Sequence, residues 1–301
     1  MSQYTSAKLI TPPREEESIY PYRRVWRSLT IELGVLFALT VLIYGAVGIA
    51  GFGVPRPLSG GLNIALALTP AALWGIFSLW AERRVPEGRR HLLGIAVISA
   101  LTANAIAIPV LDWLQPAQWL TFTGVFDRIL GYAFTVGIIQ IGLQYLVVRF
   151  ITWPDAYRIR EDAIAFTTAS AVGYITVLNL YAVWVDAPNA DVVALRVFTN
   201  TSLALLAAVV LAYGLAELRF QPKLYYTLPL TLLIAAVLIG VGITFRTNFS
   251  SGGFVLGVGG TRPLFGLGFS AGLVFAGMLS MLFLFNVSER QSREAREGRG
   301  E

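Results

Sequence analysis

The amino-acid sequence predicts an all-α, polytopic integral membrane protein, a bundle of about eight transmembrane helices. Three observations predict this fold class. Hydrophobic residues occupy 55% of the 301 positions and charged residues only 14%, a balance far from that of a soluble domain. Eight apolar stretches follow one another, each close to the roughly 20 residues that cross a bilayer. Lys and Arg gather in alternate connections between these stretches.

A polar tail, residues 1–30, precedes the first apolar stretch. It lacks the charged start and short apolar core of a signal peptide, so we expect no cleavage. Its last residues mix Tyr, Trp and Arg, a composition typical of a membrane interface. The bundle follows over residues 31–287, and residues 288–301 form a second polar tail. The predicted spans are Leu33–Phe52, Leu62–Trp80, Leu92–Val110, Ile129–Val148, Ala163–Val185, Val197–Ala216, Tyr226–Thr244 and Leu267–Phe285.

The basic residues indicate the orientation of these spans. Of the 23 Lys and Arg residues, 18 fall in the two tails and in the connections after the second, fourth and sixth spans. Because Lys and Arg are retained on the cytoplasmic side, we expect both termini in the cytoplasm. We expect the membrane to be a bacterial plasma membrane. The other five basic residues fall on the opposite side: Arg56, Arg128, Arg196, Arg246 and Arg262.

Residue usage excludes several classes of function. The chain has no cysteine and a single histidine, His91, so disulfides, thiolate metal sites and haem ligation by several imidazoles are excluded. We therefore expect no cofactor and no metal. The net charge of +5 marks the cytoplasmic side of a membrane protein rather than a nucleic-acid partner. The lipid bilayer is the first partner that the composition implies.

Side-chain amides inside the apolar stretches are the most informative polar residues. GIIQIGLQYLVVRF, from Gly137, places Gln140 and Gln144 one turn apart on one face of the fourth span. An amide in hydrocarbon is costly without a partner, so this face should look into the bundle. We expect it to meet Thr176 and Asn179 of the fifth span. Together with Asn200 of the sixth span, these residues form the candidate polar groove, or interhelical contact.

The order of segments resembles the PrsW family of glutamate-type intramembrane proteases. ALTPAALWGIFSLWAERRVPEGRR, from Ala67, resembles that family's proline-containing second span and its basic loop. The stretch from Gly137 resembles the span that carries Glu-Glu-x-x-Lys. REDAIAFTTASAVGYITVLNLYAV, from Arg160, resembles the family's Asp-Gly loop and its Gly-Phe-x-x-x-Glu-Asn-x-x-Tyr helix. The resemblance implies a PrsW-like bundle.

The sequence departs from this family at the positions that ionise. Gln140 and Ile141 stand where the resemblance implies paired glutamates, and Gln144 stands at the lysine. Leu178 replaces the glutamate before the asparagine. The later histidines are absent, and the stretch beginning at Asn200 offers only Asn, Thr and Ser. Peptide hydrolysis needs a base and an acid, so we expect no catalytic residue in this chain and lean against an enzyme.

The sequence therefore predicts a catalytically silent PrsW-like protein that binds or scaffolds other membrane protein chains. Three alternatives remain open: a structural accessory subunit of a larger membrane complex, an active hydrolase with unrecognised residues, and a small-molecule transporter. Partner helices against the fourth and fifth spans favour the first interpretation, and a partner on the lipid-facing surface with a closed interior favours an accessory subunit. A metal, or a water held by two carboxylates, favours a hydrolase, and inverted repeats favour a transporter.

Overall fold

A computed structural model describes residues 24–82, 89, 91–120, 123–153, 156–220, 226–251 and 263–297. Every regular element in these ranges is helical. The elements in chain order are α2 (Arg24–Ile43), η2 (Tyr44–Ile49), α3 (Arg56–Trp74), η3 (Gly75–Leu79), α4 (Trp80–Glu82), α5 (Leu92–Thr102), η4 (Ala103–Ala107), α6 (Ile108–Leu114), α7 (Pro116–Leu120), α8 (Val125–Tyr132), η5 (Ala133–Gly137), α9 (Ile138–Thr152), α10 (Arg160–Asp186), α11 (Ala190–Phe220), α12 (Thr227–Ser251) and α13 (Pro263–Glu297).

Within the described residues, eight helical segments are long and apolar enough to cross a membrane, which confirms the predicted fold class. The protein is thus an integral membrane protein. Each segment contains or closely matches one predicted span, and most are several residues longer. The segments are Val25–Ile49, Pro57–Leu79, Leu92–Leu120, Val125–Thr152, Arg160–Asp186, Ala190–Phe220, Thr227–Arg246 and Leu264–Arg290.

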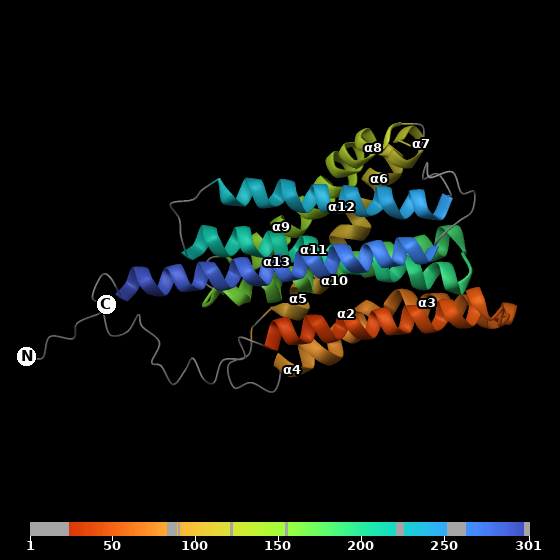
Figure 1. The fold of residues 1–301 in the computed structure, drawn as a ribbon, viewed down its shortest axis with the longest axis horizontal. Helices are drawn as coiled ribbons and strands as arrows, with labels where there is room; N and C mark the ends of the chain where they lie inside the picture. The colour runs from red at the N-terminus through yellow and green to blue at the C-terminus, as the bar shows by residue number, and fades with distance from the viewer. Residues whose placement is uncertain are drawn as a thin grey trace, which may run out of the picture.

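The bundle is built around α10 and α11. In their apolar stretches, 83% and 89% of the residues are buried, against 17–44% in the other six. Figure 1 shows the two helices side by side in the middle of the bundle, with α12 along one flank and α2 and α3 along the other. Their small side chains, such as Ala169, Ala207, Ala208 and Ala212, are fully buried. Small residues of this kind allow membrane helices to approach closely.

The first four spans each contain a wider, π-helical turn. These turns are η2, η3, η4 and η5, and each is continuous with α-helix on at least one side. A π-helical turn inserts an extra residue, which re-aims the side chains that follow it. The turn η5 ends at Gly137, within one helical turn of Gln140, and therefore helps to set the direction in which that amide points.

One end of the bundle holds buried ion pairs. Arg160 at the start of α10 pairs with Glu217 near the end of α11, and Ser288 of α13 donates a hydrogen bond to the same carboxylate. Arg89 donates from Nε to Asp162 Oδ1 over 2.6 Å and also pairs with Glu82. These residues come from segments with the predicted cytoplasmic excess of Lys and Arg. The structure therefore brings alternate connections to a common end, as the charge pattern predicts.

Two predicted boundaries differ from the structure. The first helix begins at Arg24, inside the predicted tail, so Glu32 lies in its third turn rather than before the span. Glu32 is 5% exposed and accepts a hydrogen bond from Ser78 Oγ over 2.5 Å. The predicted loop between the spans that end at Thr244 and begin at Leu267 is also too long, because α12 continues to Ser251 and α13 starts at Pro263. The rest of that loop, and residues 1–23 and 298–301 of the tails, fall outside the described residues.

Candidate functional site

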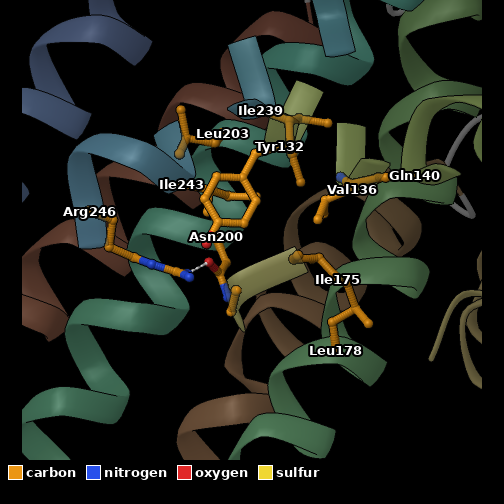
Figure 2. A pocket seen from close by; sticks show the side chains of 12 residues that line it. Tyr132, Val136, Gln140, Ile175, Leu178, Asn200, Leu203, Ile239, Ile243 and Arg246 are labelled. Carbon is orange, nitrogen blue, oxygen red and sulfur yellow. Dashed lines mark hydrogen bonds between the residues drawn. The ribbon is translucent and has the colours of Figure 1, made fainter. Parts of the chain in front are cut away.

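A pocket of about 270 Å³ is lined by residues of the helical elements from α7 to α12. Figure 2 shows its polar side chains, with Arg246 and Gln140 entering from opposite sides. Six of the lining residues are aliphatic residues larger than alanine, so the walls are mainly apolar. The lining residues are Ala117, Tyr132, Val136, Gln140, Ile175, Leu178, Asn200, Leu203, Ala204, Ile239, Ile243 and Arg246.

Two glycines bring α12 to this pocket. A Cβ on Gly137 would lie 2.9 Å from the backbone Cα of Ala236, and a Cβ on Gly240 would lie 2.8 Å from the backbone nitrogen of Ala133. Only a hydrogen at these positions permits so close a contact between helices. Because α12 lies directly against η5 and α8, its residues Ile239, Ile243 and Arg246 face the pocket together with Tyr132 and Val136.

A chain of hydrogen bonds joins the charged side of the pocket to α10. Arg246 donates to Asn200 Oδ1. Asn200 Nδ2 donates to Asn179 Oδ1 over 3.0 Å, and Asn179 Nδ2 donates to Thr201 Oγ1 over 3.5 Å. The chain links α12, α11 and α10 and orients each amide, because every oxygen accepts while every nitrogen donates. The Arg246 side chain is therefore held at the pocket wall.

The two glutamines of α9 lie in the interior, as their spacing predicts. Gln140 is 3% exposed and lines the pocket, and Gln144 is fully buried. No hydrogen bond joins either glutamine to α10 among the described residues, however. Among the described residues, Nε2 of Gln140, both polar atoms of Gln144 and Oγ1 of Thr176 have no hydrogen-bond partner.

Helices α9 and α10 are nevertheless in contact, and the small residues of both helices also pack against other neighbours. Gly137 of the fourth span packs on Ala236 of α12, and Gly173 of α10 packs on the backbone of Ala96 in α5. The candidate residues therefore divide into two groups. Gln140 and Asn200 line the pocket, whereas Gln144, Thr176 and Asn179 are buried but do not line it.

Sequence reasoning missed Arg246 and Tyr132 as site residues. The predicted seventh span ends at Thr244, so Arg246 counted only as a basic residue of the outer connection. The structure continues that helix beyond Arg246. Charged side chains on membrane helices line cavities or pair with other groups. The position of Arg246, two residues beyond the predicted end of the seventh span, is the signal that could have identified it. Tyr132 carried no distinguishing pattern.

The lining can hold a polar group but offers little for hydrolysis. None of the twelve lining residues is a carboxylate or an imidazole, and the one formal charge among them is that of Arg246. Among the described residues, no three His, Asp or Glu side chains gather as metal ligands would. Amides, a phenol and a guanidinium can donate hydrogen bonds to a bound acceptor, and the guanidinium favours an anion.

Comparisons with known proteins give no match. No protein-family model matches the sequence, and no curated protein or solved structure is similar to the chain.

Proposed function

We propose that this chain is a PrsW-like membrane protein that lacks hydrolytic groups at its central site. In this proposal the pocket lined by residues of α7 to α12 binds a segment of another membrane protein chain without cutting it. The bound chain is held by hydrogen bonds from amides and from Arg246. The protein acts as a binding or scaffolding component of the membrane.

One observation carries this proposal. Gln140, Leu178 and Asn200 stand at positions where the resemblance implies a paired glutamate, a second glutamate and the start of the histidine stretch. They belong to three different helices, α9, α10 and α11, and they line one pocket. Motif positions that form one site in a family should meet in space, so their convergence supports the resemblance independently of the sequence pattern.

The chemistry of the lining favours binding over hydrolysis. Cleavage of a peptide bond needs a base to activate water and an acid for the leaving amine. The amide of Gln140 neither takes up nor releases a proton near neutral pH, and Leu178 is apolar. An amide can still donate to a backbone carbonyl. Gln140 Nε2 is buried and has no hydrogen-bond partner among the described residues, so a carbonyl brought against it would satisfy an otherwise unpaired donor.

The open pocket also favours a binding protein over the accessory-subunit alternative. An accessory subunit with a purely structural role should fill its interior with its own side chains. Here a cavity of about 270 Å³ remains beside a buried amide. We also propose that the membrane is a bacterial plasma membrane. Both termini then lie in the cytoplasm, because 18 of the 23 basic residues fall in the tails and in the connections on the same side.

Photocrosslinking in the native membrane tests the proposal. A photoreactive amino acid at Val136, which lines the pocket, should form discrete adducts with another protein. The same group at Leu279, which is 51% exposed on α13, is the matched lipid-facing control. Gln140→Leu should weaken the Val136 adducts and leave those at Leu279 unchanged. The proposal is wrong if both positions give the same adducts, or if the purified protein cleaves the captured chain.

A further inference from the structure

We propose that the chain bound in the pocket is recognised by a carboxylate that it carries within an otherwise apolar segment. In this proposal Arg246 binds the carboxylate, and Gln140 donates a hydrogen bond to a backbone carbonyl of the same segment. The inference rests on the proposed function and names the chemical feature that distinguishes the partner from other membrane chains.

The charge of the pocket lining points to an anion. Arg246 carries the one formal charge among the twelve lining residues, and most of the remaining surface is apolar. A guanidinium is protonated near neutral pH and forms its strongest hydrogen bonds with carboxylates and phosphates. An apolar surrounding strengthens this attraction, because water does not screen the charges. A carboxylate entering from the membrane would therefore be favoured over a neutral group of the same shape.

The geometry of Arg246 suits such a binding role. Its guanidinium donates to Asn200 Oδ1, and Asn200 is held in turn by Asn179. Figure 2 shows this bond at the edge of the pocket, with the guanidinium reaching toward the cavity. A side chain held in one position by its neighbours loses less conformational freedom when a ligand arrives. The charge is thus positioned before the partner binds.

Gln140 points to a peptide rather than a lipid. It enters the pocket from the side opposite Arg246, and its Nε2 has no partner among the described residues. A fatty acid has a single polar end, so it would leave this donor unpaired when its carboxylate meets Arg246. A peptide segment supplies both a carboxylate and backbone carbonyls. The cavity of about 270 Å³ lies just below the size of a typical small-molecule site, so it admits a short portion of a chain.

Binding of synthetic ligands tests this inference. The probes are an apolar transmembrane peptide with one Glu near one end, the same peptide with Gln, oleate and oleyl alcohol. Affinities are measured with the full chain in lipid nanodiscs. We expect the Glu peptide to bind the wild-type protein at least about tenfold more tightly than the Gln peptide, because a hydrogen bond to a charged group is stronger than a neutral one.

Three variants assign the effect to the pocket. Arg246→Met should abolish the preference for Glu over Gln, whereas Arg246→Lys should retain part of it. Gln140→Leu should weaken both peptides equally. Arg219→Met is the control, because Arg219 is an exposed arginine at the other end of α11. Unchanged elution as a single species establishes that each variant is folded.

The outcomes separate the two proposals. Equal binding of both peptides, unchanged in Arg246→Met, overturns the carboxylate inference and leaves the proposed function standing. Failure of both peptides to bind overturns the proposed function as well. Binding of oleate alone, lost in Arg246→Met, assigns the pocket to a lipid and overturns the peptide partner.

Discussion

Two buried amides on neighbouring helices differ in what they bond to. Asn179 exchanges hydrogen bonds with Asn200 and Thr201, whereas neither polar atom of Gln144 has a partner among the described residues. An unpaired buried polar group costs about 1–3 kcal/mol. Gln144→Leu should therefore raise the free energy of unfolding by about 1 kcal/mol. Asn179→Leu should lower the free energy of unfolding by about 1–2 kcal/mol, because Asn200 Nδ2 then loses its acceptor.

Unfolding of both variants in one detergent, followed by circular dichroism, measures this difference. The opposite signs matter more than the sizes, because both changes replace an amide with leucine in the same part of the bundle. Equal destabilisation by the two substitutions would mean that Gln144 is hydrogen-bonded in the folded protein, and the prediction would be wrong.

The ion pair between Arg160 and Glu217 should contribute more to stability than an exposed pair. Their side chains are 8% and 3% exposed, and Ser288 donates to the same carboxylate. Removing one partner of a buried pair leaves the other charge unpaired and costs about 3–5 kcal/mol. Arg160→Met should destabilise the protein by that amount. Arg196→Met is the matched control, because its pair with Asp186 is 28% and 48% exposed and should contribute at most about 1 kcal/mol. Chemical denaturation of the two variants provides the measurement.

Tyr157, between α9 and α10, should make the protein sensitive to alkali. The residue is 3% exposed, and burial raises the pKa of its phenol from 10.0 to about 12. Because the folded pKa is the higher one, the neutral phenol's contribution is complete below pH 10 and is lost as the pH rises to about 12. A shift of this size corresponds to roughly 2–3 kcal/mol.

Stability measured between pH 9 and about 12 should therefore fall less in Tyr157→Phe than in the wild-type protein. Tyr226→Phe serves as the control, because Tyr226 is 58% exposed. Arg89, also outside the spans, should not contribute to this fall. Burial alone would lower the pKa of Arg89, but the charges of Asp162 and Glu82 outweigh burial and hold it above its usual value. Parallel pH curves for Tyr157→Phe and the wild type would contradict the prediction.

Gly173 lets α10 pack directly against the backbone of α5. A Cβ on Gly173 would lie 2.7 Å from the backbone carbonyl carbon of Ala96, so the two helices would have to separate. Overpacking of this kind costs about 1–3 kcal/mol or more. Gly173→Ala should destabilise the protein accordingly. Gly142→Ala in α9 meets no atom within 4 Å and should stabilise it by about 0.5–1 kcal/mol, through helix propensity alone. Thermal unfolding that shows the same sign for both variants would refute the packing argument.

The spacing of Gln140 and Gln144 predicted which way α9 faces, but it could not predict what they face. Helical periodicity relates residues within one helix, so it correctly places both amides in the interior. Which helix lies opposite depends on the packing of distant small residues, such as Gly137 on Ala236 of α12. No local pattern encodes that choice. Arg246 was missed for a similar reason, because a charged residue near the end of an apolar stretch is compatible with either a helix or a loop.

The number of spans could be predicted, but their arrangement could not. Span length and apolar composition follow from the thickness of the bilayer. The apolar character of a span does not indicate whether it is central, because lipid accommodates an apolar helix surface as well as other helices do. The fifth and seventh spans illustrate this point. The seventh is the most apolar of the eight, yet 44% of its apolar stretch is buried, whereas the fifth is the least apolar and 83% buried. Many of the buried residues of the fifth span are small, and small residues let neighbouring helices approach closely.

The two ends of the bundle differ in charge, and this difference makes the topology testable. Arg160, Glu217 and Ser288 meet at one end, which also contains Arg89 and Asp162. Eight spans return the chain to the side on which it began, so both polar tails should share that end. With 18 of 23 basic residues on it, this end should face the cytoplasm.

Single cysteines test this topology directly, because the chain contains none. We expect cysteines replacing Ser2 and Ser292 to react with a membrane-impermeant maleimide only after the cells are opened. A cysteine replacing Gln118, an exposed residue of α7, should react in intact cells. The reason is that Gln118 lies in the last turns of the third span, Leu92–Leu120, and therefore at the end opposite to the buried ion pairs. If Ser2 and Ser292 label from opposite sides, the number of crossings is odd and the eight-span topology is wrong. If all three sites show the reverse sidedness, the bundle stands but its orientation is inverted, and the pocket lined by Arg246 then opens toward the cytoplasmic half of the membrane.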